Sequence, residues 1–308
     1  MTPENIVLTR QKDFSYRLVR RFDSLEGDMK KETFVPYEFI ENAAMELSDY
    51  FVSFVKLEQT STQEYARLAG SGTLVEIEGT HAILTADHVF DDLPRRSGNV
   101  GLVLATRFQP QLHRFTINME HVEKLRVARG TCESDGPDLA LLILDRSQLG
   151  SIKAMKSFYN LSKRRDQILS NPPATDVGVW LLSGMAEEWT SNTTPEKGYE
   201  IVKVFRGMHG IGLVEVEYML NGYDCLEFKA KYNENYEGPR SYGGYSGGGL
   251  WHLLIAKRED GDIEVTDRIL SGVAFYESPI EDQIRKIKCN GRQSIYRNVI
   301  NNIRQRRS

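Results

Sequence analysis

The sequence of 308 residues has only three cysteines, Cys132, Cys225 and Cys289, which lie far apart and never form a CxxC pair. So few thiols at such spacings fit a disulfide framework or a cysteine-based zinc site poorly. Buried thiols in a reducing compartment account for them better. We therefore expect a cytoplasmic protein.

Long apolar runs and a strong charge of one sign are also missing. No window approaches the roughly 18 consecutive apolar residues of a membrane-crossing helix, and the first residues lack the basic and then apolar pattern of a secretory signal. With 39 basic and 43 acidic side chains, the net charge is −4. We expect neither a membrane nor nucleic acid as a partner. After Asp282 the charged residues are all basic, which is more typical of a solvated helix face than of a nucleic-acid site.

The first 49 residues differ in pattern from the rest. Residues 13–22 mix charged side chains with aromatic ones. Residues 37–47 carry apolar side chains at helical spacing, directly after Pro36, and the first turn of a helix tolerates a proline. The sequence predicts an N-terminal helical extension over residues 1–49, with one or two helices packed on the main domain.

From Tyr50 onward, short apolar runs alternate with turn residues, which is typical of an all-β barrel or sandwich. Residues 50–145 and 176–308 show this pattern. Between them, residues 146–175 are rich in Lys, Arg and Ser, and we interpret them as a helical linker. Ser294, as an N-cap before an apolar stripe, predicts a helix at the end of the second β domain.

Three polar side chains lie at the ends of predicted strands. His88 follows an apolar run, Asp138 opens the apolar run 139–144, and Ser246 lies in a turn with five glycines, 240–251 (RSYGGYSGGGLW). A serine hydroxyl becomes a nucleophile when an imidazole takes its proton, and a buried carboxylate holds the tautomer of that imidazole. Backbone N–H groups of a glycine-rich turn can bind an oxyanion because no side chain obstructs them.

The segments around these side chains resemble the motifs of a known family. Residues 85–89 (TADHV), 138–142 (DLALL) and 244–248 (GYSGG) look like the histidine, aspartate and serine motifs of the trypsin-like (chymotrypsin-fold) serine peptidases, in the same order. The resemblance covers about residues 50–305. It implies an all-β fold of two antiparallel six-stranded barrels, with the helical extension, linker and C-terminal helix added.

The same resemblance implies a role for each residue of the site. Ser246 would be the nucleophile, His88 the general base and then acid, and Asp138 the orienting carboxylate. The N–H groups of Gly244 and Ser246 would form the oxyanion hole. The substrate backbone would pair with a strand that contains Phe275, Tyr276 and Glu277. No metal or cofactor is implied.

Other residues compete for these roles. The pattern G-x-S-x-G also fits the nucleophile elbow of α/β-hydrolases, but that fold needs a later histidine, and the one that follows Ser246 is His252, six residues on. The same strand would hold His252 away from the serine. Asp138 is preferred as the carboxylate because it directly precedes a buried run, unlike its competitors Asp87, Asp91, Asp92 and Asp135.

Two positions bear on activation and specificity. Tyr245 stands where many relatives have an aspartate that captures a newly cut N-terminus, so the chain looks closer to the HtrA-like, bacterial intracellular branch, without a PDZ domain. The oxyanion loop would then be ordered by a substrate or a partner. Arg240 stands six residues before Ser246, where the family has the floor of its primary pocket, and the resemblance therefore predicts an acidic P1 side chain. Glu277 argues against an acidic P1 side chain. If Arg240 and Glu277 both line the pocket, they could pair with each other.

These observations predict a serine endopeptidase that acts through an acyl-enzyme intermediate on a protein or peptide substrate. Two alternatives stay open. One is a partner-gated protease effector of a bacterial defence or stress system, such as anti-phage defence, which would add a regulatory protein as a partner. The other is a catalytically silent relative that binds peptides in its cleft.

Overall fold

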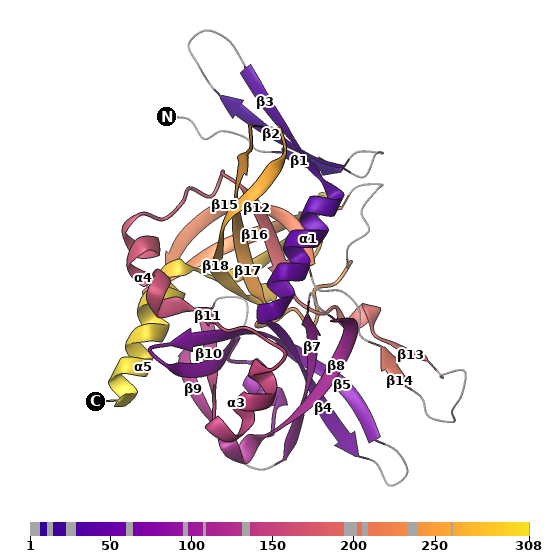
Figure 1. Ribbon diagram of the computed structural model, residues 1–308, viewed down its shortest axis with the longest axis vertical. Coiled ribbons are helices and arrows are strands. Elements are labelled where there is room, and N and C mark those ends of the chain that lie inside the picture. Colours follow the sequence, from indigo (N-terminus) through magenta and orange to yellow (C-terminus); the bar gives the residue numbers. More distant parts are fainter. Residues whose placement is uncertain are drawn as a thin grey trace.

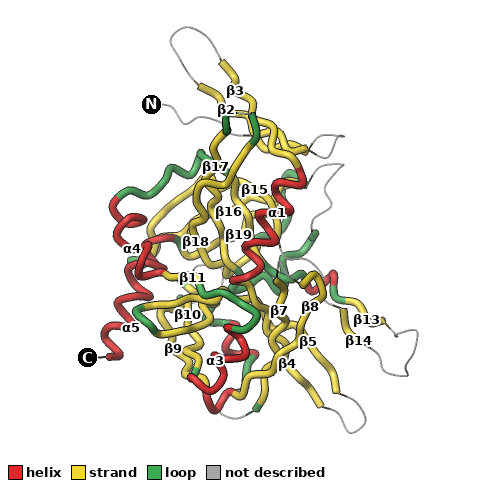
Figure 2. Tube along the Cα trace, viewed as in Figure 1, coloured by secondary structure: helices red, strands yellow, loops and turns green. Residues whose placement is uncertain are grey.

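The protein is described here from a computed structural model (Figure 1). The structure describes residues 7–10, 15–22, 29–59, 64–94, 98–106, 109–130, 136–193, 202–204, 209–232, 239–259 and 261–307. Strands dominate, and helices lie mainly at the sides of the two large sheets (Figure 2). No helix among these residues has the length and the apolar character needed to cross a membrane.

The first half of the β region forms an eight-stranded sheet with the order β8-β7-β4-β5-β6-β10-β9, in which β11 pairs in parallel with β5. Every residue of β10, which pairs with β6 and β9, is buried. The strands are β4 (Phe51–Gln59), β5 (Glu64–Ile77), β6 (Thr80–Thr85), β7 (Asn99–Thr106), β8 (Gln109–Asn118), β9 (Val122–Arg129), β10 (Asp138–Leu144) and β11 (Tyr159–Asn160).

The second half closes into an antiparallel barrel with the order β12-β15-β16-β19-β18-β17. Bulges in β15 and β18 interrupt the pairing register, and such bulges help a sheet to curve. The strands are β12 (Val179–Ser183), β15 (His209–Leu220), β16 (Tyr223–Lys231), β17 (Gly249–Lys257), β18 (Ile263–Glu277) and β19 (Ile284–Asn290). A separate pair is formed by β13 (Ser191–Thr193) and β14 (Val202–Val204).

The predicted all-β fold class is confirmed, with two differences in the first half: its described strands form a sheet that does not close into a barrel, and their number differs from the prediction. The barrel has the six strands that we expected, whereas the first sheet has eight. One of the additional strands, β11, comes from the predicted linker. It pairs there because the chain returns along β5 between two helices, α3 (Arg146–Lys153) and α4 (Leu161–Ser170). A strand of two residues is too short to leave a recognisable sequence pattern.

The N-terminal residues correct the predicted extension in part. The helix α1 (Tyr37–Leu47) has the predicted bounds and leads into a short turn of helix, η1 (Ser48–Tyr50). The described residues before it form no helix but a three-stranded sheet at one end of the molecule (Figure 1), with β1 (Val7–Arg10), β2 (Ser15–Phe22) and β3 (Met29–Pro36). The sequence of β2, SYRLVRRF, alternates apolar and polar residues at several positions, and this period of two favours a strand.

The chain ends in the predicted helix, which consists of η4 (Ser294–Val299) and α5 (Ile300–Arg307). Ser294 is not its N-cap. It lies inside the helix and donates through its backbone N–H and its hydroxyl to the Asp224 carboxylate. The basic residues of this helix pair with the first sheet, because Arg304 binds Glu78 and Arg306 binds Glu123. These ion pairs agree with the interpretation of the basic segment as a helix face.

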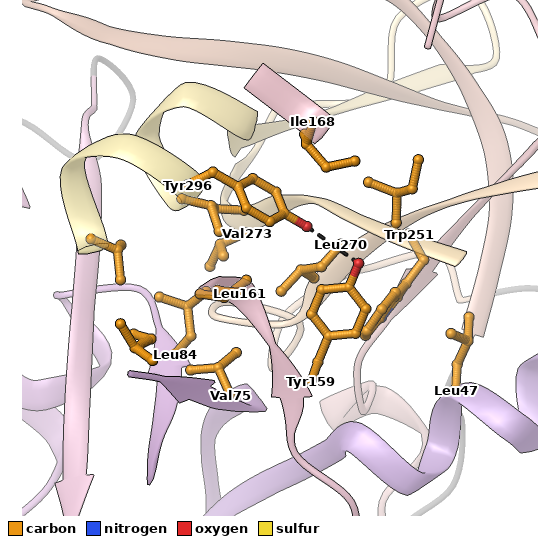
Figure 3. Packing of buried hydrophobic residues seen from close by; sticks show 14 of the residues in the cluster. Leu47, Val75, Leu84, Tyr159, Leu161, Ile168, Trp251, Leu270, Val273 and Tyr296 are labelled. Carbon is orange, nitrogen blue, oxygen red and sulfur yellow. Dashed lines mark hydrogen bonds between the residues drawn. The ribbon is translucent and has the colours of Figure 1, made fainter. Parts of the chain in front are cut away.

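A buried aromatic cluster joins the parts of the molecule (Figure 3). The Tyr159 ring of β11 contacts Tyr50 and Trp251 edge-on, with ring centroids 5.7 and 5.2 Å apart. The Tyr296 hydroxyl donates to the Tyr159 hydroxyl at 3.3 Å, and the latter donates to the Arg268 carbonyl at 3.1 Å. The extension, linker, barrel and C-terminal helix therefore share one core, which holds the two sheets together.

Two of the three cysteines are buried free thiols, as expected, and Cys132 lies outside the described residues. Burial raises the pKa of the Cys225 thiol to about 11, and burial also raises the pKa of Cys289. Both thiols are therefore protonated and unreactive near neutral pH.

Candidate active site

His88 and Asp138 lie side by side at the junction of β6 and β10. His88 follows β6 and precedes α2 (Val89–Asp92), while Asp138 is the first residue of β10. The His88 Nδ1 atom is 2.6 Å from Asp138 Oδ2, and the His88 backbone N–H donates to Asp138 Oδ1 at 3.0 Å. The aspartate side chain is 4% exposed and the histidine side chain 21%. A proton on Nδ1 satisfies this pair and leaves Nε2 as a proton acceptor.

Asn290, which the sequence analysis missed, fixes the backbone of Asp138. The side chain of Asn290 accepts from the Asp138 N–H at 3.3 Å and donates to the Asp138 carbonyl at 2.6 Å. Asn290 is the last residue of β19 and is fully buried, so the barrel itself holds the carboxylate in place. No motif surrounds this asparagine in the sequence, and its role depends on contacts 152 residues away.

The Ser246 loop lies next to His88. The Ser246 carbonyl accepts from the Ser71 N–H at 2.7 Å. A Cβ atom on Gly70 would approach this carbonyl oxygen to 3.1 Å and a methyl carbon of Val89 to 2.8 Å, so the loop sits beside the residue after His88. Among the described residues the structure records no hydrogen bond at the Ser246 hydroxyl. Contacts of this kind are often loose in the absence of substrate.

Every carbonyl group of residues 242–246 has a hydrogen-bond donor. Tyr245 N–H donates to Tyr242, and Gly248 N–H donates to Tyr245. Glu187 N–H donates to the Gly243 carbonyl at 2.9 Å. The remaining two carbonyls, of Gly244 and Ser246, are bound by Ser71.

These bonds determine where the N–H groups of Gly244 and Ser246 point. In a planar trans peptide the N–H points away from the carbonyl of the same unit. The Gly243 and Tyr245 carbonyls are turned towards their donors, so the N–H groups of Gly244 and Ser246 face the other way. Within the described part of the chain, neither N–H has an acceptor. Two such donors on either side of Tyr245 can bind a negatively charged oxygen.

The competing aspartates have other partners. Asp87 is fully buried and binds Arg126 at 2.8 Å and Arg129 at 3.2 Å, and Asp91 binds Arg129 at 2.6 Å. The Arg129 guanidinium lowers the pKa of Asp91. Asp92 pairs with Arg67, and Asp135 lies outside the described residues. Of the described carboxylates, the one paired with the His88 ring is therefore that of Asp138.

The residues predicted to determine specificity do not pair with each other. Glu277 forms an ion pair with Arg285, and its carboxylate also accepts from Ser241 Oγ at 2.9 Å and from Tyr242 N–H at 2.7 Å. The side chain of Arg240 is exposed, and its backbone N–H donates to Glu188 at 2.6 Å. Because Arg285 compensates the charge of the Glu277 carboxylate, Glu277 no longer argues against an acidic P1 side chain.

The strand end that was predicted to pair with substrate has one free edge in the described structure. Tyr276 and Glu277 pair with β19 on one side, whereas the ladder with β17 stops at Val273. The Phe275 side chain is buried and packs over Gly136, because a Cβ there would lie 2.7 Å from the phenyl ring. Phe275 thus anchors the strand through its side chain and leaves the backbone edge for pairing.

His252 is a core residue in this structure. It is fully buried, its ring stacks on Trp180 with centroids 4.1 Å apart, and its Nε2 lies 2.5 Å from the Val177 carbonyl. Burial lowers the pKa of His252 to about 4. The imidazole is therefore neutral near pH 7 and is held away from the Ser246 loop by its own hydrogen bond.

Protonation of His252 makes stability depend on pH in a defined window. In the unfolded chain a histidine binds a proton below about pH 6.5, whereas the folded protein binds it only below about 4. The contribution of His252 to stability is thus complete above pH 6.5 and falls as the pH drops towards 4, by about 1.4 kcal/mol per unit. We expect His252→Phe to remove this slope, measured by urea unfolding between pH 4.5 and 7.5. An unchanged slope would contradict a neutral, buried His252.

In the part of the chain that the structure describes, no three His, Cys, Asp or Glu side chains come together as metal ligands. The sequence matches no family model and no curated protein.

The solved structures that are similar to the chain include the following three. The HtrA-type protease AlgW with a decapeptide has a TM-score of 0.42 and 14% identity, over 86% of this chain and 67% of that chain. A variant of AlgW with a decapeptide has a TM-score of 0.37 and 14% identity, over 80% of this chain and 62% of that one. The catalytically inactive tobacco etch virus protease complexed with substrate has a TM-score of 0.32 and 10% identity, over 81% of each chain. Likenesses this distant assign no activity to the chain.

Proposed function

We propose that the chain is a serine endopeptidase whose triad is His88, Asp138 and Ser246. The observation that carries the proposal is the 2.6 Å contact between His88 Nδ1 and the buried Asp138 carboxylate, in a segment whose next residue, Val89, adjoins the Ser246 loop. An aspartate in this position holds the imidazole in the tautomer that accepts a proton at Nε2. The serine loop next to it supplies the only other groups that acyl transfer requires, a hydroxyl and two N–H donors.

The reaction would follow from these positions. Ser246 Oγ attacks the scissile carbonyl carbon while its proton moves to His88 Nε2, and the N–H groups of Gly244 and Ser246 bind the oxyanion. His88 then gives this proton to the leaving amine, which leaves an acyl group on Ser246. Water, activated by the same imidazole, releases the acid. Asp138 stabilises the imidazolium in both halves, and the substrate backbone adds along the free edge at Tyr276 and Glu277.

A peptide-binding relative without turnover is the second candidate. It is favoured by the Ser246 hydroxyl, which has no hydrogen bond among the described residues. The partner-gated effector of a bacterial defence or stress system is favoured less, because the loop carbonyls already have their donors. A loop that waits for a partner would leave some of them unbound.

Labelling with a fluorophosphonate separates these candidates. We expect the wild-type chain to gain one adduct by intact mass, with peptide mapping on Ser246, and Ser246→Ala to gain none. Each variant is first shown to fold by circular dichroism. A folded wild type that stays unlabelled, alone and with added protein substrates, would contradict the proposed peptidase and favour the peptide binder.

A further inference from the structure

The two residues of the oxyanion hole share one hydrogen-bond partner in the other sheet. Ser71 belongs to β5 and is fully buried. Its backbone N–H donates to the Ser246 carbonyl at 2.7 Å, and its hydroxyl donates to the Gly244 carbonyl at 2.7 Å. A single residue of the first sheet therefore binds the two carbonyls that flank Tyr245.

The Ser71 hydroxyl is itself held in a fixed direction. It accepts from the Met185 N–H at 3.3 Å and lies 3.2 Å from Ser53 Oγ. A hydroxyl has one proton, and that of Ser71 goes to Gly244, so Ser53 must be the donor to Ser71. The Ser71 carbonyl in turn accepts from Thr85 Oγ1 at 2.8 Å. Ser53 on β4 and Thr85 on β6, the two strands beside β5, thus fix the hydroxyl and the carbonyl group of Ser71.

Gly244 needs such a restraint more than an ordinary residue. Its φ angle is +93°, in the region that favours glycine, and a Cβ would lie 2.3 Å from Leu68 Cδ2 and 2.4 Å from the Met185 carbonyl. Without a side chain, the peptide units on either side of a glycine rotate easily. A bond to the Gly244 carbonyl restricts this rotation and so fixes the direction of its N–H.

We infer that Ser71 is a positioning residue of the oxyanion hole, and that its hydroxyl holds Gly244 N–H in the direction that binds the oxyanion. The inference rests on the proposed peptidase function. Ser71 touches neither the substrate nor the reacting atoms. Its effect falls on stabilisation of the tetrahedral species and leaves ground-state binding unchanged.

The test compares Ser71→Ala with Ser53→Ala. Both serines are fully buried and pair across β4 and β5, and either substitution removes the contact between the two hydroxyls. The bond to the Gly244 carbonyl and the bond from the Met185 N–H are lost in Ser71→Ala alone. The probe is diisopropyl fluorophosphate, whose phosphoryl oxygen takes the place of the oxyanion, and saturation kinetics give the maximal rate of serine phosphorylation and the half-saturating concentration.

We expect Ser71→Ala to lower the maximal rate about tenfold at an unchanged half-saturating concentration, less than the hundredfold or more for loss of an oxyanion donor itself. Ser53→Ala should stay within about twofold of wild type. Equal rates in the two variants, whether both normal or both reduced, would overturn the inference. A wild type that does not react would instead remove the proposed peptidase function.

A second pair keeps the test decisive if Ser71→Ala does not fold. Ser71→Cys fills nearly the same space and keeps a weak donor, and its matched control is Ser53→Cys. We expect a reduction of about threefold in the maximal rate for Ser71→Cys and no change for Ser53→Cys. The same rate in both cysteine variants would overturn the inference.

Discussion

Ser246→Ala and His88→Ala are each expected to lower turnover about a million-fold. The first removes the nucleophilic oxygen. The second leaves the Ser246 hydroxyl with no base to take its proton, since the Ser246 loop lies beside Val89, the residue after His88. The measurement is the rate of cleavage of a fluorogenic peptide, selected with the wild-type chain from a peptide library and used at saturating concentration.

The double variant tests whether these residues act as one unit. Because each single change already stops proton transfer, Ser246→Ala combined with His88→Ala should be no slower than either alone. His252→Phe is the matched control, since it also removes an imidazole but one that binds the Val177 carbonyl inside the barrel. If the double variant lost as much turnover as the two single losses multiplied together, Ser246 and His88 would work independently.

Features that depend on a local pattern could be predicted from the sequence. The spacing of apolar residues after Pro36 predicted α1 with its bounds. The position of Asp138 before a buried run predicted its contact with His88, because a residue at the start of a buried strand has little access to solvent. In both cases neighbouring residues determine the structure.

Features that depend on distant contacts could not be predicted. Asn290 meets Asp138 across 152 residues, and Ser71 meets Gly244 across 173. Arg285 pairs with Glu277 because β18 and β19 are neighbours in the barrel, whereas the sequence offered only Arg240 as a possible partner. In each case the side chain has an ordinary sequence context, and tertiary structure alone supplies its partner.

The expectation that a partner orders the oxyanion loop also rested on one residue, Tyr245. Its ring is buried and packs on Gly184, where a Cβ would lie 2.0 Å from the ring. The loop is held by this packing together with Glu187 N–H and Ser71. An aspartate that captures a new N-terminus is one way to fix such a loop, and the contacts of Tyr245 provide another within the chain.

Asp138→Asn is expected to lower turnover about ten-thousand-fold with little loss of binding. The new amide group can donate to His88 Nδ1, which stabilises the tautomer that carries its proton on Nε2. That imidazole cannot accept the Ser246 proton. The measurement is the saturating cleavage rate of the selected fluorogenic peptide at pH 7, together with its half-saturating concentration.

Asp87→Asn is the matched control, because Asp87 is equally buried and adjoins His88 in sequence but binds Arg126 and Arg129. We expect it to lower the free energy of unfolding on the order of 2 kcal/mol, since the two arginines stay partly hydrated, and to change turnover less than about tenfold. If Asp87→Asn lowered turnover more than Asp138→Asn does, the orienting carboxylate would be that of Asp87. The comparison of Asp138→Asn with Asp87→Asn thus distinguishes the carboxylate that sets the tautomer of His88 from the carboxylate that stabilises the turn after β6.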